Sequence, residues 1–132
     1  MGKFYIGQSV LFQKKFTQED ILKYAELTGD YNPLHVDCEY AKKSRFGKNI
    51  VHGMLVMGVM SKILGTQLPG CGSIYMEQNV QFKKPVYVGD SVEFKVKITS
   101  ITNHIITLET NVYSGETCVV LGTAKMLYEG VE

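Results

Sequence analysis

One long apolar segment, followed by strand-like segments, constrains the fold of this chain more than any other feature. Ile50–Leu64 carries apolar side chains almost all round a helix, which is typical of a helix buried on every side. After Gly65 the periodicity changes to that of strands, joined by turns too short for parallel pairing. Strands are predicted over Val10–Phe12, Ser73–Phe82, Ser91–Ile101, His104–Tyr113 and Thr117–Tyr128. We therefore expect an α+β fold in which an antiparallel sheet wraps a long central helix.

Two shorter helices are predicted upstream of the long one. Thr17 and Asp20 have the spacing of a capping box, and Gly29 is placed to end the helix that they begin. Asp37 is a suitable cap for a second, short helix over Cys38–Lys43. Between these two helices we expect an irregular loop.

This loop, Asp30-Tyr31-Asn32-Pro33-Leu34-His35, concentrates reactive side chains. Pro33 prevents a helix from running through it, and the Gly-Asp and Asn-Pro pairs are typical of a turn. If the turn brings Asp30 and His35 together, the two side chains could orient one water, with His35 as base and Asp30 as acid or second base. The alternative is that Asp30 and Asn32 are turn and cap residues and that His35 is an ordinary polar loop residue.

The start of the long helix is a second candidate site. The first N–H groups of a helix lack acceptors within it, and the helix dipole there favours negative charge. The Gly53 N–H could therefore stabilise a developing oxyanion. The alternative is that Gly53 and Gly58 allow the helix to pack closely against the sheet. His52 is expected to pack and to form a hydrogen bond at the helix start.

Length, charge and cysteine content exclude several classes of function. A chain of 132 residues is expected to form one domain with its own core. The formal net charge of +1 argues against nucleic-acid binding as the main task. The three cysteines form no C-x-x-C pair, so free thiols in a reducing compartment are expected and no metal site is assigned. No apolar run has the length of a signal peptide at the start or of a membrane span, so we expect a cytoplasmic protein with no membrane partner.

These motifs resemble a known family. The pattern Asp30-x-Asn32-Pro33-x-His35-x-Asp37, followed by Gly47 and His52-Gly53-Met54, is similar to the hydratase motif of the MaoC-like hot-dog family. The likeness is closest to the (R)-specific enoyl-CoA hydratases and extends from about Phe16 to Leu127. It implies a single MaoC-like hot-dog domain over residues 1–132 and a homodimer or higher homo-oligomer.

The resemblance also implies a reaction and the residues that perform it. The reaction is the reversible addition of water to trans-2-enoyl-CoA, which gives (R)-3-hydroxyacyl-CoA. Asp30 and His35 would be the catalytic pair, and the Gly53 N–H would be the oxyanion donor. No metal and no cofactor is expected, since coenzyme A is part of the substrate.

Substrate contacts are expected along the long helix. Asn32 in the loop is also assigned to substrate binding. Ser61 matches a position that lines the acyl pocket in relatives, and residues three and four apart on a helix share a face. The substrate-binding residues expected on the helix are Met57, Met60, Ser61 and Leu64. Their bulk predicts a preference for short acyl groups such as crotonyl, and charge alone suggests Arg45, Lys48 or Lys83 for the CoA phosphates.

Two other functions are compatible with such a fold. A hot-dog acyl-CoA thioesterase would use similar oxyanion chemistry, although it has no need of the combined Asp30 and His35 loop. A non-catalytic acyl-CoA-binding module would need neither side chain. Release of free thiol, as opposed to loss of the conjugated enoyl absorbance, distinguishes the first of these from a hydratase.

Overall fold

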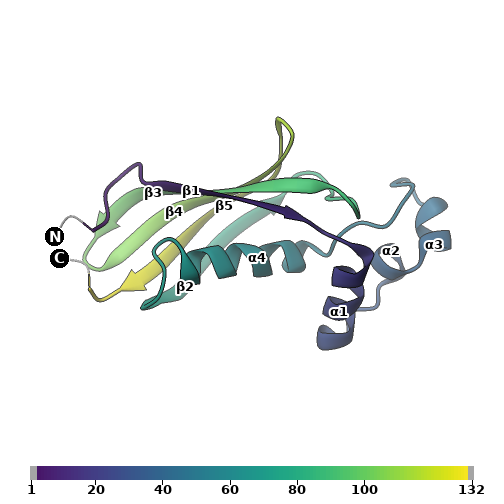
Figure 1. The fold of residues 1–132 in the computed structure, drawn as a ribbon, viewed down its shortest axis with the longest axis horizontal. Helices are drawn as coiled ribbons and strands as arrows, with labels where there is room; N and C mark the ends of the chain where they lie inside the picture. The colour runs from purple at the N-terminus through teal and green to yellow at the C-terminus, as the bar shows by residue number, and fades with distance from the viewer. Residues whose placement is uncertain (1–2, 131–132) are drawn as a thin grey trace.

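The protein folds as a single antiparallel sheet with helices at one end and along one face (Figure 1). The computed structural model describes residues 3–130. Its elements are β1 Ser9–Lys15, α1 Gln18–Thr28, α2 Pro33–Val36, α3 Cys38–Lys42, α4 Gly53–Thr66, β2 Ser73–Phe82, β3 Ser91–Thr102, β4 Ile105–Ser114 and β5 Thr117–Tyr128. The strand order β1-β3-β4-β5-β2 leaves β1 and β2 at the edges, and every adjacent pair is antiparallel.

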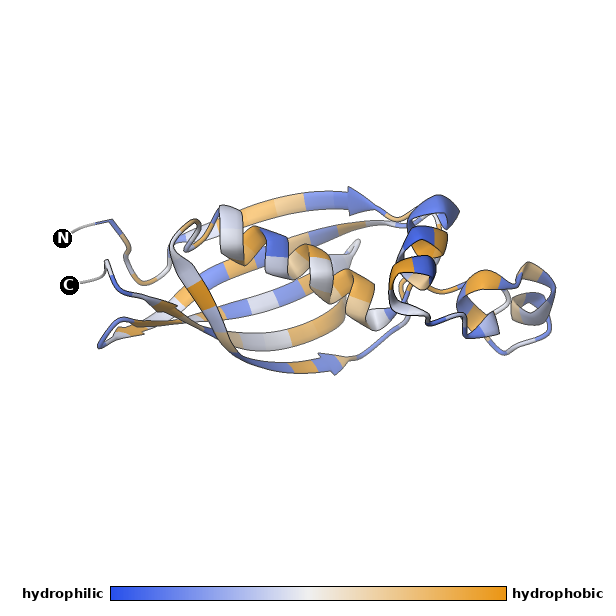
Figure 2. Cartoon of the chain, turned by 90° about the horizontal axis from the view of Figure 1, so that it is seen from below, coloured by the Kyte–Doolittle hydropathy of each residue, from blue (hydrophilic) through white to orange (hydrophobic). Residues whose placement is uncertain are grey.

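The core lies between α4 and one face of the sheet (Figure 2). From α4, Met60 and Ile63 are completely buried, and from β3 the alternating residues Phe94, Val96 and Ile98 are buried as well. The strand therefore has one buried face and one face with greater exposure, as its alternating sequence predicts. A long helix packed on an antiparallel sheet is the hot-dog arrangement, so the expected fold class is confirmed.

The start of α4 differs from the expected one. The helix begins at Gly53 and not at Ile50. Ile50 forms an isolated antiparallel bridge with Tyr87, and the Val51 N–H donates to the Val86 carbonyl at 2.7 Å. These long-range hydrogen bonds hold residues 50 and 51 in an extended conformation. The apolar pattern of the sequence does not reveal such bonds, so it predicted helix there.

The loop before this segment is more regular than expected. Residues Pro33–Val36 form one helical turn, α2, where the sequence predicted an irregular segment. Proline is tolerated at the first position of a helix because its missing N–H would have no partner there. The Asn32 side chain caps the turn by accepting a hydrogen bond from the Leu34 N–H at 3.0 Å.

The other two predicted helices are found, and α3 ends at Lys42, one residue before the predicted end. Thr17 and Asp20 form a complete capping box at the start of α1, and the hydrogen bond from the Thr17 N–H lowers the pKa of the Asp20 carboxyl. Gly29 ends α1 in the left-handed conformation with a φ of 84°. Asp37 caps α3 through the Tyr40 N–H. Together α1, α2 and α3 lie beyond the N-terminal end of α4, away from both chain ends (Figure 1).

Two expectations from composition concern membranes and thiols. Within residues 3–130, no helix has the length and apolar character needed to cross a membrane. All three cysteines lie in this range and are free thiols, as expected.

Candidate active site

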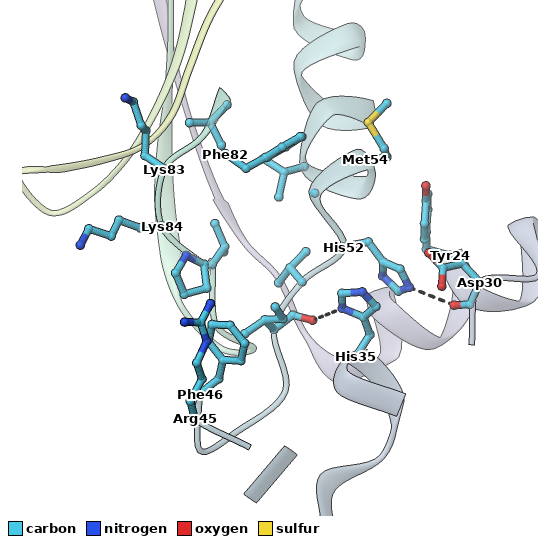
Figure 3. A pocket seen from close by; sticks show the side chains of 17 residues that line it. Tyr24, Asp30, His35, Arg45, Phe46, His52, Met54, Phe82, Lys83 and Lys84 are labelled. Carbon is cyan, nitrogen blue, oxygen red and sulfur yellow. Dashed lines mark hydrogen bonds between the residues drawn. The ribbon is translucent and has the colours of Figure 1, made fainter. Parts of the chain in front are cut away.

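A cavity of about 490 Å³ lies between the helical end of the molecule and the start of α4 (Figure 3). On one side it is lined by Asp30, His35 and His52, which come from the α1–α2 connection, α2 and the residue before α4. The opposite side is formed by the segment that follows β2 and by Arg45 and Phe46. Both candidate sites from the sequence, the loop and the helix start, therefore face one cavity.

His35 is held in a defined tautomer. Its Nδ1 lies 2.7 Å from the Ile50 carbonyl oxygen, which can only accept, so Nδ1 carries the proton. In the neutral ring the Nε2 lone pair is then left free to take a proton. Ile50 is fixed in turn by its bridge to Tyr87, so the extended segment before α4 sets the orientation of His35.

Asp30 lies directly after the residue that ends α1. One atom each from Asp30, His35 and His52 lies within 4.8 Å of the others, so the predicted approach of Asp30 to His35 is confirmed. The Asp30 carboxylate also accepts a hydrogen bond from the Asn32 N–H at 3.2 Å. Asp30 is therefore both a turn residue and a neighbour of His35, as the two interpretations of the loop predicted separately. The catalytic role of the pair stays a prediction.

His52 links these parts. Its side chain is buried, its Nε2 lies 3.1 Å from the Asp30 backbone carbonyl, and its ring stacks on that of His35 at 4.0 Å. The ring of Tyr24 lies against the His52 ring at 4.6 Å. Burial is the largest cause that lowers the pKa of His52, because it penalises the charged imidazolium. The expectation that His52 packs and forms a hydrogen bond is confirmed.

Gly53 is the first residue of α4. Among residues 3–130, its N–H has no hydrogen-bond acceptor, and it lines the same cavity as Asp30 and His35. A Cβ atom on Gly53 would lie 2.8 Å from a ring carbon of Phe82, so the glycine lets this half-exposed ring pack closely against the start of α4. Both interpretations of Gly53 from the sequence are compatible with this geometry, and they do not compete.

The cluster of Asp30, His35 and His52 has the residue types of a metal site but not its geometry. His35 and His52 each direct one ring nitrogen at a backbone carbonyl. The two rings are stacked with an angle of 26° between their planes. We assign no metal to these residues, and the expected absence of a metal stays a prediction.

A second cavity, of about 460 Å³, lies between α4 and the edge strand β2. Met57 and Ser61 line it, as expected for an acyl site, together with Tyr75 and Gln78 of β2. Met54 lines both cavities and thus lies between them. The second cavity therefore extends along α4 from the first.

Three of the predicted substrate contacts lie elsewhere. Met60 and Leu64 are fully buried in the core and line neither cavity, because they lie on the face of α4 that packs into the molecule. Asn32 is exposed and lines neither cavity, and its side-chain carbonyl is used to cap α2. In this structure these residues make no direct contact with either cavity.

Positive charge gathers at the rim of the first cavity. Arg45, Lys83 and Lys84 line it on the side opposite His35 (Figure 3). Lys48 does not line the cavity; its ammonium group lies over the Tyr87 ring at 5.7 Å. Of the three cations suggested by the sequence for CoA phosphates, the structure thus places Arg45 and Lys83 at this rim and adds Lys84.

Sequence reasoning missed two residues that support the site. Asn49 is buried, and its amide donates to the carbonyls of Leu34, within the short helix that carries His35, and of Asp37, which ends that helix. Phe82 covers Gly53 from the end of β2. No local pattern assigns Asn49 or Phe82 to the site, and only the tertiary fold brings them there.

Comparison with known proteins agrees with this geometry. The sequence profile of the MaoC like domain matches residues 3–118. An (R)-specific enoyl-CoA hydratase from Aeromonas caviae is 41% identical over 122 residues, which cover 90% of this chain and 91% of the relative. A protein of the same name from Rhodospirillum rubrum is 40% identical over 126 residues, which cover 94% of this chain and 82% of the relative.

Solved structures give the same result. The (R)-hydratase from A. caviae involved in PHA biosynthesis superposes with a TM-score of 0.93 at 38% identity, covering 97% of this chain and 99% of that one. An R-hydratase from Pseudomonas aeruginosa in the unliganded form has a TM-score of 0.90 at 30% identity, with coverage of 95% and 82%. The fold and most of the chain are therefore shared with these proteins.

Proposed function

The chain belongs to the MaoC-like domain family, and on this premise we propose that it is an (R)-specific enoyl-CoA hydratase. It adds water reversibly to trans-2-enoyl-CoA and forms (R)-3-hydroxyacyl-CoA. The observation that carries the proposal is that Asp30, His35 and the Gly53 N–H face one cavity. Two relatives named (R)-specific enoyl-CoA hydratase support the same reaction, since this chain matches 91% and 82% of their lengths.

The geometry suggests how the reaction proceeds. A water held between Asp30 and the free Nε2 of His35 loses a proton to this pair while its oxygen bonds to the β-carbon. The electrons of the double bond move toward the thioester oxygen, where the Gly53 N–H stabilises the negative charge. A proton from the pair then reaches the α-carbon and restores the thioester. In this proposal every proton transfer uses side chains of the chain, and no cofactor takes part.

The direct test is a hydration assay with crotonyl-CoA. We expect loss of the conjugated enoyl absorbance without release of free thiol, and chiral analysis should give the (R)-3-hydroxy product. Free thiol release at a comparable rate would indicate a thioesterase instead. Binding of crotonyl-CoA with neither reaction would indicate an acyl-CoA-binding module.

In this proposal the substrate occupies both cavities, with the CoA phosphates at the first and the acyl tail in the second. The CoA phosphates contact Arg45, Lys83 and Lys84, because cationic side chains bind phosphate oxygens strongly. The acyl tail runs past Met54 into the second cavity, between Met57 of α4 and the side chains of β2. Met60 and Leu64 lie in the core and line neither cavity, so they are no longer assigned to the acyl tail.

We predict a graded preference for short acyl groups. Each methylene in an apolar pocket changes the binding free energy by about 1–3 kcal/mol, so crotonyl-CoA should be preferred to octenoyl-CoA without an absolute limit. Met57→Ala should raise kcat/KM for octenoyl-CoA relative to crotonyl-CoA, because Met57 lines the second cavity. Ile63→Ala, with a similar loss of buried volume on the same helix, is the matched control. An unchanged ratio in a folded Met57→Ala enzyme would contradict the placement of the tail.

We also propose that the active unit is a homodimer formed through the edge strand β2. A free edge strand presents unpaired backbone groups, and β2 adds exposed apolar side chains, Ile74 at 54% and Met76 at 58% exposure. A second copy of the chain would cover both, and the same strand in each copy would form a symmetric contact.

The dimer contact predicts different effects at the two edges of the sheet. Ile74→Lys on β2 should shift the protein to a monomer at micromolar concentration, as measured by light scattering after size exclusion. Leu11→Lys on the opposite edge strand β1 is the control, because Leu11 is equally exposed at 57%. A monomeric wild-type protein, or a Leu11 variant that dissociates while the Ile74 variant does not, would refute this interface.

The remaining proposals concern partners and compartment. The net charge of +1 gives no general attraction to nucleic acid, and we propose none as a partner. Exposed free thiols such as Cys38 and Cys71 are compatible with a reducing compartment, and we propose the cytoplasm.

A further inference from the structure

His52 joins the two halves of the proposed active site. One half is the α1–α2 connection and α2, which carry Asp30 and His35, and the other is the first turn of α4, which begins with Gly53. His52 is the residue that immediately precedes Gly53. Its backbone belongs to the second half, while its side chain reaches into the first.

The backbone of His52 fixes the start of α4. Its carbonyl oxygen accepts hydrogen bonds from the N–H groups of Leu55 at 3.0 Å and Val56 at 3.2 Å. These bonds begin the helix, and the Gly53 N–H, as the first of α4, has no acceptor within it. The position of the proposed oxyanion donor therefore depends on the backbone of His52.

The side chain of His52 fixes the other half. Its Nε2 lies 3.1 Å from the Asp30 carbonyl, and because a carbonyl only accepts, Nε2 is the donor. Its ring stacks on His35 at 4.0 Å and is backed by Tyr24 at 4.6 Å (Figure 3). A single side chain thus contacts Asp30 through a hydrogen bond and His35 through its ring face.

A proton carrier would be placed differently. With Nε2 protonated, the remaining nitrogen Nδ1 is an acceptor, and this atom is buried with no hydrogen-bond partner among the described residues. A second proton there would create a buried cation that faces His35, with Asp30 and Tyr24 as the other titratable neighbours. The side chain is therefore built to stay neutral with its proton on Nε2.

We infer that His52 is a positioning residue that sets the distance between the Asp30–His35 pair and the Gly53 N–H. It does so through the hydrogen bond to Asp30 and the stack on His35, and it exchanges no proton with the substrate. The inference rests on the proposed hydratase function for its kinetic part, but the hydrogen bond and the tautomer exist independently of any activity.

Three substitutions separate the contributions of the side chain. His52→Phe keeps a flat ring against His35 and removes the donor to Asp30. His52→Gln keeps an N–H donor near the place of Nε2 and removes the ring. Val96→Ala, in the core of β3 and outside both cavities, is the control for a general loss of stability.

We expect His52→Phe to lower kcat by about 100-fold with a smaller change in KM, since a displacement of about 1 Å in a reacting group has an effect of this size. His52→Gln should recover most of this loss and should keep both ionisation limbs in the pH profile of kcat/KM. The control variant should keep the wild-type kcat at temperatures where it is folded. Wild-type kcat in the folded phenylalanine variant, or a limb that disappears in the glutamine variant, would overturn the inference.

A measurement without substrate distinguishes this inference from the proposed function. The chain has three histidines, so the ring nitrogens can be resolved by NMR after ¹⁵N labelling. We expect His52 to remain neutral with its proton on Nε2. If this pattern is seen and wild-type protein hydrates no enoyl-CoA, the proposed function fails while the structural link stands. A proton on Nδ1 of neutral His52 would overturn the link itself.

Discussion

Asp30→Asn and His35→Gln should each lower kcat for crotonyl-CoA hydration by on the order of 10³-fold, because each removes one of the two groups that act on a single water. The fold should survive both changes. Asparagine can still accept the hydrogen bond from the Asn32 N–H, and His35 is bound by one side-chain hydrogen bond, to Ile50. Since both groups serve one step, the double variant should be little slower than either single one. Steady-state kinetics together with circular dichroism would measure this.

The chain offers matched controls for these substitutions. Asp37→Asn changes an acid in the same region that caps α3 and lines neither cavity. His104→Gln changes a histidine in the turn between β3 and β4. Both should keep kcat close to that of the wild type. Turnover near the wild-type value in either Asp30→Asn or His35→Gln would remove that residue from the proposed mechanism.

Removal of the Gly53 N–H should lower kcat by about 10²- to 10³-fold, the range found for loss of one oxyanion donor. Proline removes this N–H, and the first position of a helix tolerates proline. His52, which would precede the proline, already has a ψ of 132°, within the range that proline imposes on its neighbour. The obstacle is the Phe82 ring, because a Cβ on residue 53 would lie 2.8 Å from it.

The comparison is therefore made in a Phe82→Ala background. Gly53→Pro with Phe82→Ala lacks the N–H, whereas Gly53→Ala with Phe82→Ala has a Cβ and keeps the N–H. The two double variants should have similar KM values and stabilities, and their kcat values should differ by the factor given above. Equal kcat values in two folded enzymes would show that the Gly53 N–H does not bind the thioester oxygen.

The parts of the fold that depend on short-range patterns could be predicted from sequence. The alternation through β3 and the capping box of Thr17 and Asp20 are both found as expected. The prediction was wrong where hydrogen bonds to distant segments determine the backbone conformation. Ile50 and Val51 are extended because they pair with residues 86 and 87, and no local pattern records this pairing.

The site follows the same division. The Asp30–His35 loop carries its own turn chemistry, so their approach could be predicted from six consecutive residues. The buried amide of Asn49 and the ring of Phe82 reach the site only through tertiary packing. The prediction of acyl-binding residues on α4 was wrong for Met60 and Leu64. Helical spacing groups residues on one face but does not tell which of them point into the core. Met57 and Met60 illustrate this, since Met57 lines a cavity and Met60 does not.

The contact between Phe82 and Gly53 has a consequence for how this sequence can diverge. A side chain at residue 53 would approach the Phe82 ring to 2.8 Å at its Cβ, so it requires this half-exposed ring to turn away or to be replaced by a smaller side chain. The residue found at one of these positions therefore affects which residues fit at the other. A smaller residue at position 82 removes the need for this ring movement and therefore favours a larger residue at position 53. Homologues are then expected to show covariation between these positions, with larger residues at 53 more frequent where 82 is not aromatic.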